Sequence, residues 1–310
     1  MTTFDQTENC RAVIDIGSNS VKLLIADVAG GEVTPLLREG EQTRLGRGVF
    51  ETGLLQPAAI EETTRAATAF ATKAREHGAT QIRVLATSAA RDAANCGELT
   101  GAMAAAGLKL EIISGEAEAE LVLCGVRSHP DFAKGPLAII DVGGGSTELL
   151  VVDDKTLQVQ HSFQLGTVRW LEKNPPSDPP TDAERDQLVQ ALDGFLEVQI
   201  GPLLGEVPLP DTLVGTGGTS VFLARILKKS GKLSAEELES LSISMVEVRD
   251  LSKRLWVMTM AERRQLPGLP ANRADVILFG ATIYEAVMRR CGFSKLRPSL
   301  RGVRHGALLS

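Results

Sequence analysis

Residues 12–28 read AVIDIGSNSVKLLIADV, and residues 138–154 read AIIDVGGGSTELLVVDD. When the first stretch is shifted by 126 positions (141 − 15), eight residues of the two stretches are identical. In the first stretch these are Ala12, Ile14, Asp15, Gly17, Ser20, Leu23, Leu24 and Asp27. Each copy is an apolar run, a short turn of glycine and small polar residues, and a second apolar run. The pattern predicts a strand, a tight turn and a returning strand, twice in one chain.

The two predicted turns have a composition that suits phosphate. Glycine lets the backbone approach a ligand closely, and the N–H groups and hydroxyls of such a turn can hold phosphate oxygens. The Asp at the end of each first strand can hold Mg²⁺ or a water molecule. One turn of this kind is a weak signal, because Asp and Gly are common turn residues. Two copies with matched flanks predict two similar domains that face each other across a phosphate-binding cleft.

Length and composition restrict the class of protein. The chain has 310 residues, which is enough for two domains of ordinary size. Its net charge of −6 argues against broad nucleic-acid binding, which depends on a basic surface. The four cysteines are far apart and form no metal or disulfide pattern, which fits a cytoplasmic protein. The N-terminal MTTFDQTENCR is no secretory signal, and no apolar run approaches the ~20 residues that span a bilayer.

Strands and helices alternate along the rest of the chain, which predicts an α/β fold. Pro57 favours the start of a helix that stops at Gly78, and short apolar strands follow at 82–87 and 108–113. We place the domain boundary at residue 125, so that the domains are 1–125 and 126–310, with the last helix able to pack back on the first domain.

Two further helix starts in the second half have the spacing of capping boxes, at Thr181–Glu184 and Ser234–Glu237. Residues 272–290 are mostly apolar and predict a long buried helix.

Three glutamates, Glu116, Glu118 and Glu120, open a predicted helix. Acidic residues near a helix N-terminus are favoured by the helix dipole, by about 0.3–1 kcal/mol each. Helix stability therefore accounts for at least two of the three. Glu116 and Glu120 share a helix face and Glu118 points elsewhere, but this geometry alone does not identify a functional glutamate.

Three other features have both a functional and a structural interpretation. Glu148 interrupts an apolar strand, and lies either on the solvent face or beside Asp141, where two carboxylates would suit a divalent cation.

Arg91, after the hydroxyls of Thr87 and Ser88, is either part of a phosphate clamp or a surface residue next to a helix cap. Residues 215–219 are either a third ligand-binding turn or a simple helix entry.

The end of the chain is basic. After Glu285 there is no acidic residue. The basic residues there are Arg289, Arg290, Lys295, Arg297, Arg301 and Arg304. They indicate either a solvated helix end, where cations are favoured, or a surface that guides a polyanion.

Several stretches together resemble one known family, the exopolyphosphatase/guanosine-pentaphosphate phosphohydrolase family, from about residue 11 to 308. The stretches are DIGSNSVKLLI, TSAARDAAN, EIISGEAEAELV, IIDVGGGSTELLVV, GTGGTSVFLA, RADVILFGATI and SLRGVRHGAL. The resemblance implies two ribonuclease-H-like domains, as in the superfamily of actin, sugar kinases and heat-shock chaperones, around a phosphate-binding cleft.

The resemblance also implies roles for single residues. The family's catalytic glutamate lies in an SG-x-x-E-A pattern, which here selects Glu118 as the general base. The DxGGGSTE motif implies that Asp141 and Glu148 coordinate the metal, Mg²⁺ or Mn²⁺. The residues expected to bind substrate phosphates are Ser18, Asn19, Ser20, Arg91, Gly143, Gly144, Gly145, Ser146 and Thr147.

The implied activity is that of an exopolyphosphatase, a hydrolase that releases terminal orthophosphate from inorganic polyphosphate by metal-assisted attack of water. The alternatives are hydrolysis of guanosine pentaphosphate to the tetraphosphate, and a non-catalytic sensor of either ligand. A kinase is disfavoured by the placement of Glu118.

The chain departs from the family pattern at Leu300, often Asp, and at His305, usually Glu. It also ends without the helical C-terminal portion of long members, so we expect a preference for short polyphosphate. We further expect a cytoplasmic homodimer with no nucleic-acid or membrane partner.

Overall fold

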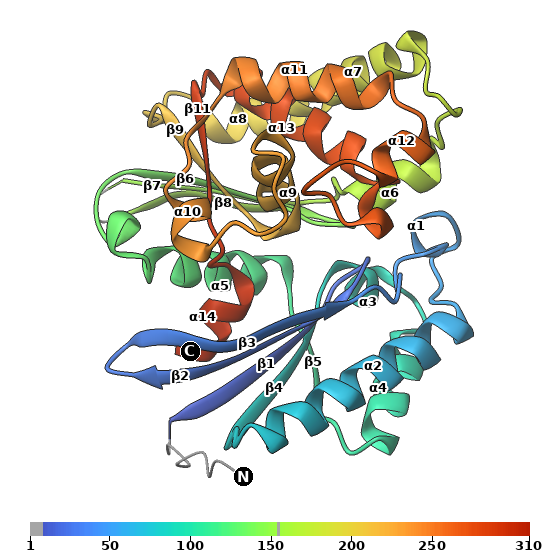
Figure 1. Cartoon of the computed structure of the whole chain (residues 1–310), viewed down its shortest axis with the longest axis vertical. Coiled ribbons are helices and arrows are strands. Elements are labelled where there is room, and N and C mark those ends of the chain that lie inside the picture. Colours follow the sequence, from blue (N-terminus) through green and yellow to red (C-terminus); the bar gives the residue numbers. More distant parts are fainter. Residues whose placement is uncertain (1–8, 154–155) are drawn as a thin grey trace. The chain divides into compact units, whose positions relative to one another are not determined.

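The computed structural model describes residues 9–153 and 156–310. It contains two compact α/β units (Figure 1). The first unit runs to Ala133 and includes Arg301–Ser310, and the second comprises Lys134–Leu300. The chain therefore passes between the units twice, after Ala133 and after Leu300. The first passage lies somewhat later than residue 125, where we expected the boundary.

The first unit is built on a five-stranded sheet of order β3-β2-β1-β4-β5. The strands are β1 (Cys10–Ile16), β2 (Val21–Ala29), β3 (Glu32–Glu41), β4 (Gln81–Ala86) and β5 (Leu110–Ile112). β1 to β3 form an antiparallel meander, whereas β4 and β5 run parallel to β1. The short strands expected at 82–87 and 108–113 are thus confirmed as β4 and β5.

Helices cover both faces of this sheet. They are α1 (Val49–Thr52), α2 (Pro57–Glu76), α3 (Ser88–Asp92), α4 (Cys96–Ala105), α5 (Gly115–Arg127) and α14 (Val303–Leu309). The apolar side of α2, including Phe70, forms one core with α4 and with strand residues such as Ile14. On the other face α14 packs on β1, β2 and β3 and against α5 (Figure 1). This contact is close because Gly125 of α5 and Gly306 of α14 face backbone atoms without side chains of their own.

The second unit repeats this architecture. Its sheet has the order β10-β11-β9-β6-β7-β8. The strands are β6 (Leu137–Val142), β7 (Thr147–Val152), β8 (Leu157–Phe163), β9 (Thr212–Thr216), β10 (Ile243–Ser244) and β11 (Lys295–Pro298). Without the edge strand β10, the order β8-β7-β6-β9-β11 matches that of the first sheet. The repeat even preserves register, since Asp15 pairs with Lys22 and Asp141 pairs with Glu148. The predicted pair of ribonuclease-H-like domains is confirmed.

The helices of the second unit are more numerous. They are α6 (Thr167–Lys173), α7 (Asp182–Phe195), α8 (Gly201–Leu204), α9 (Gly217–Leu227), α10 (Ala235–Glu239), α11 (Met245–Trp256), α12 (Met260–Arg264) and α13 (Ile277–Cys291). A π-helical turn joins α7 to α8. The capping boxes predicted at Thr181–Glu184 and Ser234–Glu237 are both formed. The helix predicted from residue 272 begins only at Ile277, because residues 271–273 form a separate 3₁₀ turn.

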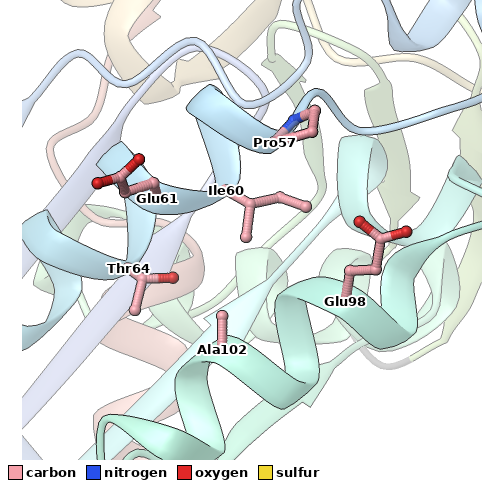
Figure 2. Close-up of a pocket in the computed structure, with 6 residues that line it drawn as sticks. All are labelled: Pro57, Ile60, Glu61, Thr64, Glu98 and Ala102. Atoms are coloured by element: carbon pink, nitrogen blue, oxygen red, sulfur yellow. The ribbon is translucent and has the colours of Figure 1, made fainter.

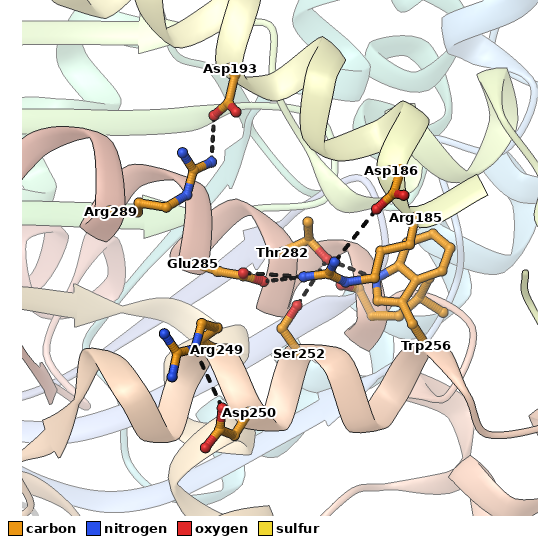
Figure 3. A network of polar contacts seen from close by, with 11 residues as sticks. Arg185, Asp186, Asp193, Arg249, Asp250, Ser252, Trp256, Thr282, Glu285 and Arg289 are labelled. Atoms are coloured by element: carbon orange, nitrogen blue, oxygen red, sulfur yellow. Dashed lines mark hydrogen bonds and ion pairs between the residues drawn. The ribbon is translucent and has the colours of Figure 1, made fainter. Parts of the chain in front are cut away.

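A buried polar network ties α13 to α11 and α7 (Figure 3). The Thr282 hydroxyl accepts a hydrogen bond from Trp256 Nε1 at 2.8 Å and donates to Leu278 O at 2.8 Å. The Ser252 hydroxyl lies 3.3 Å from the same oxygen. One turn further along α13, Glu285 accepts from Arg185 of α7 at 3.1 Å. These contacts satisfy polar groups inside the helical layer, so their role is stability.

In the described ranges, no helix is both long and apolar enough to cross a membrane. All four cysteines are free thiols.

Candidate functional site

The first glycine turn joins β1 to β2 and closes through a hydrogen bond from Gly17 N to Ser20 O of 3.0 Å. Ser18, Asn19 and Ser20, all predicted phosphate ligands, have exposed fractions of only 3%, 9% and 4%. Within residues 9–153 and 156–310, the buried Ser18 hydroxyl has no hydrogen-bond partner. Because burying an unsatisfied hydroxyl is unfavourable, this group is suited to bind a ligand oxygen or a water.

The loop after β3 holds this turn from behind. Gly46 N donates to Ser18 O at 2.7 Å, and Arg44 N donates to Asn19 O at 3.2 Å. A side chain at Gly46 would lie 2.8 Å from Ser18 Cβ, so only glycine allows this approach. In a planar trans peptide the C=O points opposite to the N–H of the next residue. With the Ser18 and Asn19 carbonyls fixed on the loop side, the N–H groups of Asn19 and Ser20 point to the other side, as a phosphate cradle requires.

The second glycine turn, between β6 and β7, closes in the same way, with Gly143 N donating to Ser146 O at 3.0 Å. The start of α6 holds it from behind. Thr167 N donates to Gly143 O at 3.0 Å, and Val168 N donates to Gly144 O at 2.8 Å. By the same peptide geometry, the N–H groups of Gly144 and Gly145 point away from α6.

Gly166 makes the second arrangement possible, as Gly46 does the first. A Cβ on Gly166 would lie 2.5 Å from the carbonyl carbons of Gly144 and Gly145. Thr147, a predicted phosphate ligand, also serves this support, since it is fully buried and its hydroxyl donates to Leu165 O at 2.6 Å. That hydroxyl proton is therefore used inside the unit, and substrate binding by Thr147 stays a prediction.

Asp141 and Glu148 face each other across β6 and β7. Glu148 is only 1% exposed and accepts a hydrogen bond from Ser162 Oγ at 2.7 Å, so the solvent-face alternative for this carboxylate is wrong. Asp141 lies against Gly217, in the third glycine turn, where a Cβ would collide with Asp141 Oδ1. Burial, and then the charge of Asp141, raise the pKa of the Tyr284 phenol far above its usual range, so the phenol stays protonated.

These two carboxylates fit a hard divalent cation better than a zinc-type site. In the part of the chain that the structure describes, no three His, Cys, Asp or Glu side chains gather closely enough to hold a metal. Mg²⁺ commonly uses one or two carboxylates and completes its shell with waters and substrate phosphates. A pair of carboxylates beside a phosphate-type turn meets that requirement.

Glu118 is set apart from its neighbours by burial. Glu116 and Glu120 are exposed, whereas Glu118 is 7% exposed in the first turn of α5. Ser114 caps this helix by accepting from Ala117 N at 3.1 Å. The structure therefore distinguishes the three glutamates where sequence spacing did not.

Arg91 contacts Glu118 directly. Arg91 Nη1 lies 3.0 Å from Glu118 Oε2 and donates to Ile113 O at 3.1 Å. The side chains are 23% and 9% exposed. Arg91 is thus largely buried and orients the carboxylate of Glu118, and phosphate binding by Arg91 stays a prediction.

The strand order brings these groups to one edge of each sheet. In the first unit, Ile16, Ala86 and Ile112 are in register at the carboxyl ends of three adjacent parallel strands. The segments that follow those ends carry the first turn, Arg91 and Glu118. Ligands of open α/β sheets bind at this edge.

In the second unit, Asp141 is in register with Thr216, which precedes the third turn. Thr219 of that turn donates to Val142 O at 3.1 Å. The third turn is a helix entry for α9 and lies beside the second turn as well. The cleft between the domains stays a prediction.

The basic residues near the C-terminus are engaged within their own units. Arg289 pairs with Asp193 at 2.5 Å, and Lys295 lies 3.5 Å from Asp211. Arg297 donates to the Glu239 carbonyl at 3.0 Å. These contacts favour the structural interpretation of this segment over the polyanion-guiding one.

Arg301 and Arg304 of this segment lie near a buried histidine. His305 is 1% exposed and lies 3.3 Å from Arg38 Nη2. Burial, followed by the charges of Arg38, Arg304 and Arg301, lowers the pKa of His305 to about 2. The imidazole is therefore neutral in the folded protein at physiological pH.

A depression of about 330 Å³ lies between α2 and α4 (Figure 2). Its lining residues are Pro57, Ile60, Glu61, Thr64, Glu98 and Ala102. None of them is a predicted site residue, so we do not assign the depression to the phosphate site.

Comparisons with known proteins agree with this geometry. The sequence model of the Ppx/GppA phosphatase family matches residues 24–310. Exopolyphosphatase 2 of Mycobacterium tuberculosis is 35% identical over 316 residues, covering 96% of this chain and 97% of the relative. The guanosine-5'-triphosphate,3'-diphosphate pyrophosphatase of Aeromonas hydrophila is 28% identical, covering 96% of this chain and 58% of the relative.

Among solved structures, the Ppx/GppA family member of Aquifex aeolicus superimposes with a TM-score of 0.79 at 29% identity, covering 97% of this chain and 96% of that chain. Motifs, duplicated fold and sequence similarity over nearly the full length lead to one conclusion. The chain belongs to the Ppx/GppA phosphatase family.

Proposed function

We propose that this chain is an exopolyphosphatase. Water attacks the terminal phosphorus of inorganic polyphosphate, the bond from that phosphorus to the bridging oxygen breaks, and the shortened chain leaves with its electron pair. The products are orthophosphate and a polyphosphate shorter by one unit. The similarity to an exopolyphosphatase at 35% identity over almost the whole chain supports this choice of substrate.

The observation that carries the proposal is the environment of Glu118. It is the buried member of three neighbouring glutamates, and Arg91 Nη1 holds its carboxylate at 3.0 Å. A fixed carboxylate at the same sheet edge as a phosphate-type turn can accept the proton of the attacking water, which is the role of a general base. Arg91 keeps the carboxylate oriented for that transfer.

The two glycine turns provide the hydrogen-bond donors that bind the substrate. Their outward N–H groups, together with the Ser18 hydroxyl, are preorganised donors for phosphate oxygens. Because the carbonyls behind them are already hydrogen-bonded, these donors need not reorganise when charge develops in the transition state.

Asp141 and Glu148 would hold the divalent cation, Mg²⁺ or Mn²⁺. A bound cation neutralises charge on the phosphate oxygens and so favours attack by an electron-rich water. The protein contributes the two carboxylates, and the hydrogen bond from Ser162 fixes the orientation of one of them.

The test is a substrate comparison with the purified chain. Orthophosphate release is measured from short polyphosphate, long polyphosphate and guanosine pentaphosphate at matched Mg²⁺. The proposal expects the highest kcat/KM for polyphosphate. A higher value for guanosine pentaphosphate would replace the proposed substrate, and no release from any of the three would reject hydrolysis.

The guanosine pentaphosphate alternative has one structural feature in its favour. Phe222, half-buried in α9, places its ring edge 3.3 Å from where a Cβ of Gly218 in the third turn would be. An aromatic face near a glycine turn can stack a base, which is worth about 1–3 kcal/mol. If this alternative holds, Phe222→Ala will raise KM for guanosine pentaphosphate and leave KM for polyphosphate unchanged.

We also propose that the enzyme acts as a homodimer in the cytoplasm. The four free thiols fit a reducing compartment. Light scattering of the purified protein measures the oligomeric state, and fractionation of cells measures the compartment.

A further inference from the structure

A buried arginine contacts the second glycine turn directly. Arg169, in the first turn of α6, is 7% exposed, and its Nε donates to Gly145 O at 2.8 Å. Its backbone N–H also donates to Gly144 O at 3.1 Å. One residue therefore holds two consecutive carbonyls of the turn.

Helix stability does not account for an arginine at this position. The first turn of a helix carries the positive end of the helix dipole, where cations are disfavoured, and burial removes the hydration of the guanidinium. The hydrogen bond to Gly145, which is not part of the helix, accounts for the arginine instead.

The contact sets the direction of one peptide group. Backbone donors of α6 fix the Gly143 and Gly144 carbonyls, whereas the third carbonyl, of Gly145, is fixed by the Arg169 side chain. Because the Gly145 C=O points toward Arg169, the N–H of Ser146 points the opposite way, with those of Gly144 and Gly145.

In the first unit, a backbone N–H and not a side chain holds the corresponding carbonyl. Asn19 is the counterpart of Gly145 under the shift of 126 positions, and its carbonyl accepts from the backbone N–H of Arg44 at 3.2 Å. A side-chain substitution at residue 44 leaves that donor in place. In the second unit the equivalent donor is a side-chain atom, so it can be removed by mutation.

We propose that Arg169 is a positioning residue for phosphate binding, which acts by orienting the Gly145–Ser146 peptide through its Nε–H donor. For its catalytic readout this inference rests on the proposed polyphosphate hydrolysis. It adds a residue that lies outside the sequence stretches quoted above for the family resemblance.

Two substitutions separate the donor from the charge. In glutamine the side-chain nitrogen is bonded to Cδ, as Nε is in arginine. Arg169→Gln therefore keeps an N–H donor at that position and removes the charge. Arg169→Lys keeps the charge and places a methylene group at that position. We expect Arg169→Gln to keep kcat/KM for short polyphosphate within about threefold, and Arg169→Lys to lose about 10–100-fold, as expected when a catalytic geometry is misplaced by a fraction of an ångström to 1 Å.

The binding of orthophosphate, measured by calorimetry, is a readout that does not need turnover. It should follow the same order: wild type and Arg169→Gln similar, Arg169→Lys weaker. Melting temperature and circular dichroism establish that each variant is folded. Should Arg169→Lys not fold, the Gln variant alone decides, because a folded Arg169→Gln that loses more than about tenfold in phosphate affinity contradicts an Nε-based role.

The reverse order, with Lys active and Gln inactive, would show that charge alone matters and would overturn the inference. Equal loss in both folded variants would overturn it as well. If the wild type binds orthophosphate but hydrolyses none of the three substrates, the proposed function fails while the ranking of phosphate affinities still tests Arg169. A wild type that binds no orthophosphate would reject the role of the turn itself.

Discussion

Replacing Gly166 by alanine adds one methyl group behind the second glycine turn. The backbone of Gly166 is extended, with φ −154° and ψ 157°, which any residue adopts, so the substitution brings no backbone strain. Its effect is steric. The new Cβ would lie 2.5 Å from the carbonyl carbons of Gly144 and Gly145.

The magnitude follows from that distance. Ordinary van der Waals contact begins near 3.4 Å, so the turn and Gly166 must separate by about 1 Å (3.4 − 2.5). Overpacking of this kind costs about 1–3 kcal/mol of stability. In a domain of this size, Tm falls by roughly 2–4 °C for each kcal/mol. A displacement of ~1 Å in a positioning element can cost about 10²-fold in rate.

The assay is kcat/KM for orthophosphate release, with the melting temperature measured in parallel. The matched control is Gly97→Ala in α4, where an added Cβ meets nothing within 4 Å. In a helix that change is neutral or stabilising by about 0.5–1 kcal/mol. If Gly166→Ala is folded and keeps kcat/KM within about twofold of wild type, support of the turn from behind is not required and the account of both glycines is wrong.

Other predictions test separate parts of the structure. Thr282→Val should lower stability by about 1–3 kcal/mol without changing kcat, because it leaves the buried Trp256 N–H without its acceptor; thermal unfolding and turnover measured together check this. Asp141→Asn should raise the Mg²⁺ concentration for half-maximal activity by about tenfold or more, and an unchanged metal titration counts against a metal role. His305 should make stability pH-dependent. Its folded pKa of about 2 lies below the unfolded value of 6.5, so its contribution is complete above about pH 6.5 and is lost as pH falls, by about 2 kcal/mol at pH 5. Replacing His305 by Gln should flatten denaturant-measured stability between pH 6.5 and 5, and a slope equal to that of wild type would contradict the assignment.

The duplicated fold could be predicted from sequence because its signal is local. Each hairpin is a continuous stretch, and strand periodicity with an Asp-x-Gly turn suffices to identify it. The shift of 126 positions reappears in the structure as matching register, with Asp15 opposite Lys22 and Asp141 opposite Glu148. The same applies to the capping boxes, whose hydrogen bonds span only three residues.

The support of the turns could not be predicted, because it depends on contacts between distant segments. Gly46 packs on Ser18 and Gly166 packs on Gly144, and neither pair is close in sequence. A glycine in a loop is ordinary, so its need for close approach becomes visible only when the partner backbone is in place.

The functional member of the three glutamates could not be identified from their spacing for the same reason. Their spacing was compatible with helix stabilisation, and only the burial of Glu118 and its contact with Arg91 separate it from the others. The family resemblance selected Glu118 in advance, whereas the residues themselves did not. The basic C-terminal segment shows the converse, since its charges were compatible with a polyanion surface or a solvated helix end but are used in contacts such as Arg289 with Asp193.

The most direct test of the central claim is orthophosphate release from short polyphosphate by wild type, Glu118→Gln and Glu116→Gln at saturating Mg²⁺. Glu118→Gln keeps the size of the side chain and removes the base, so kcat should fall about 10²–10⁴-fold. Glu116 is exposed, and its substitution should leave kcat within about twofold. An enzyme that keeps most of its turnover without Glu118, or loses it without Glu116, would contradict the account.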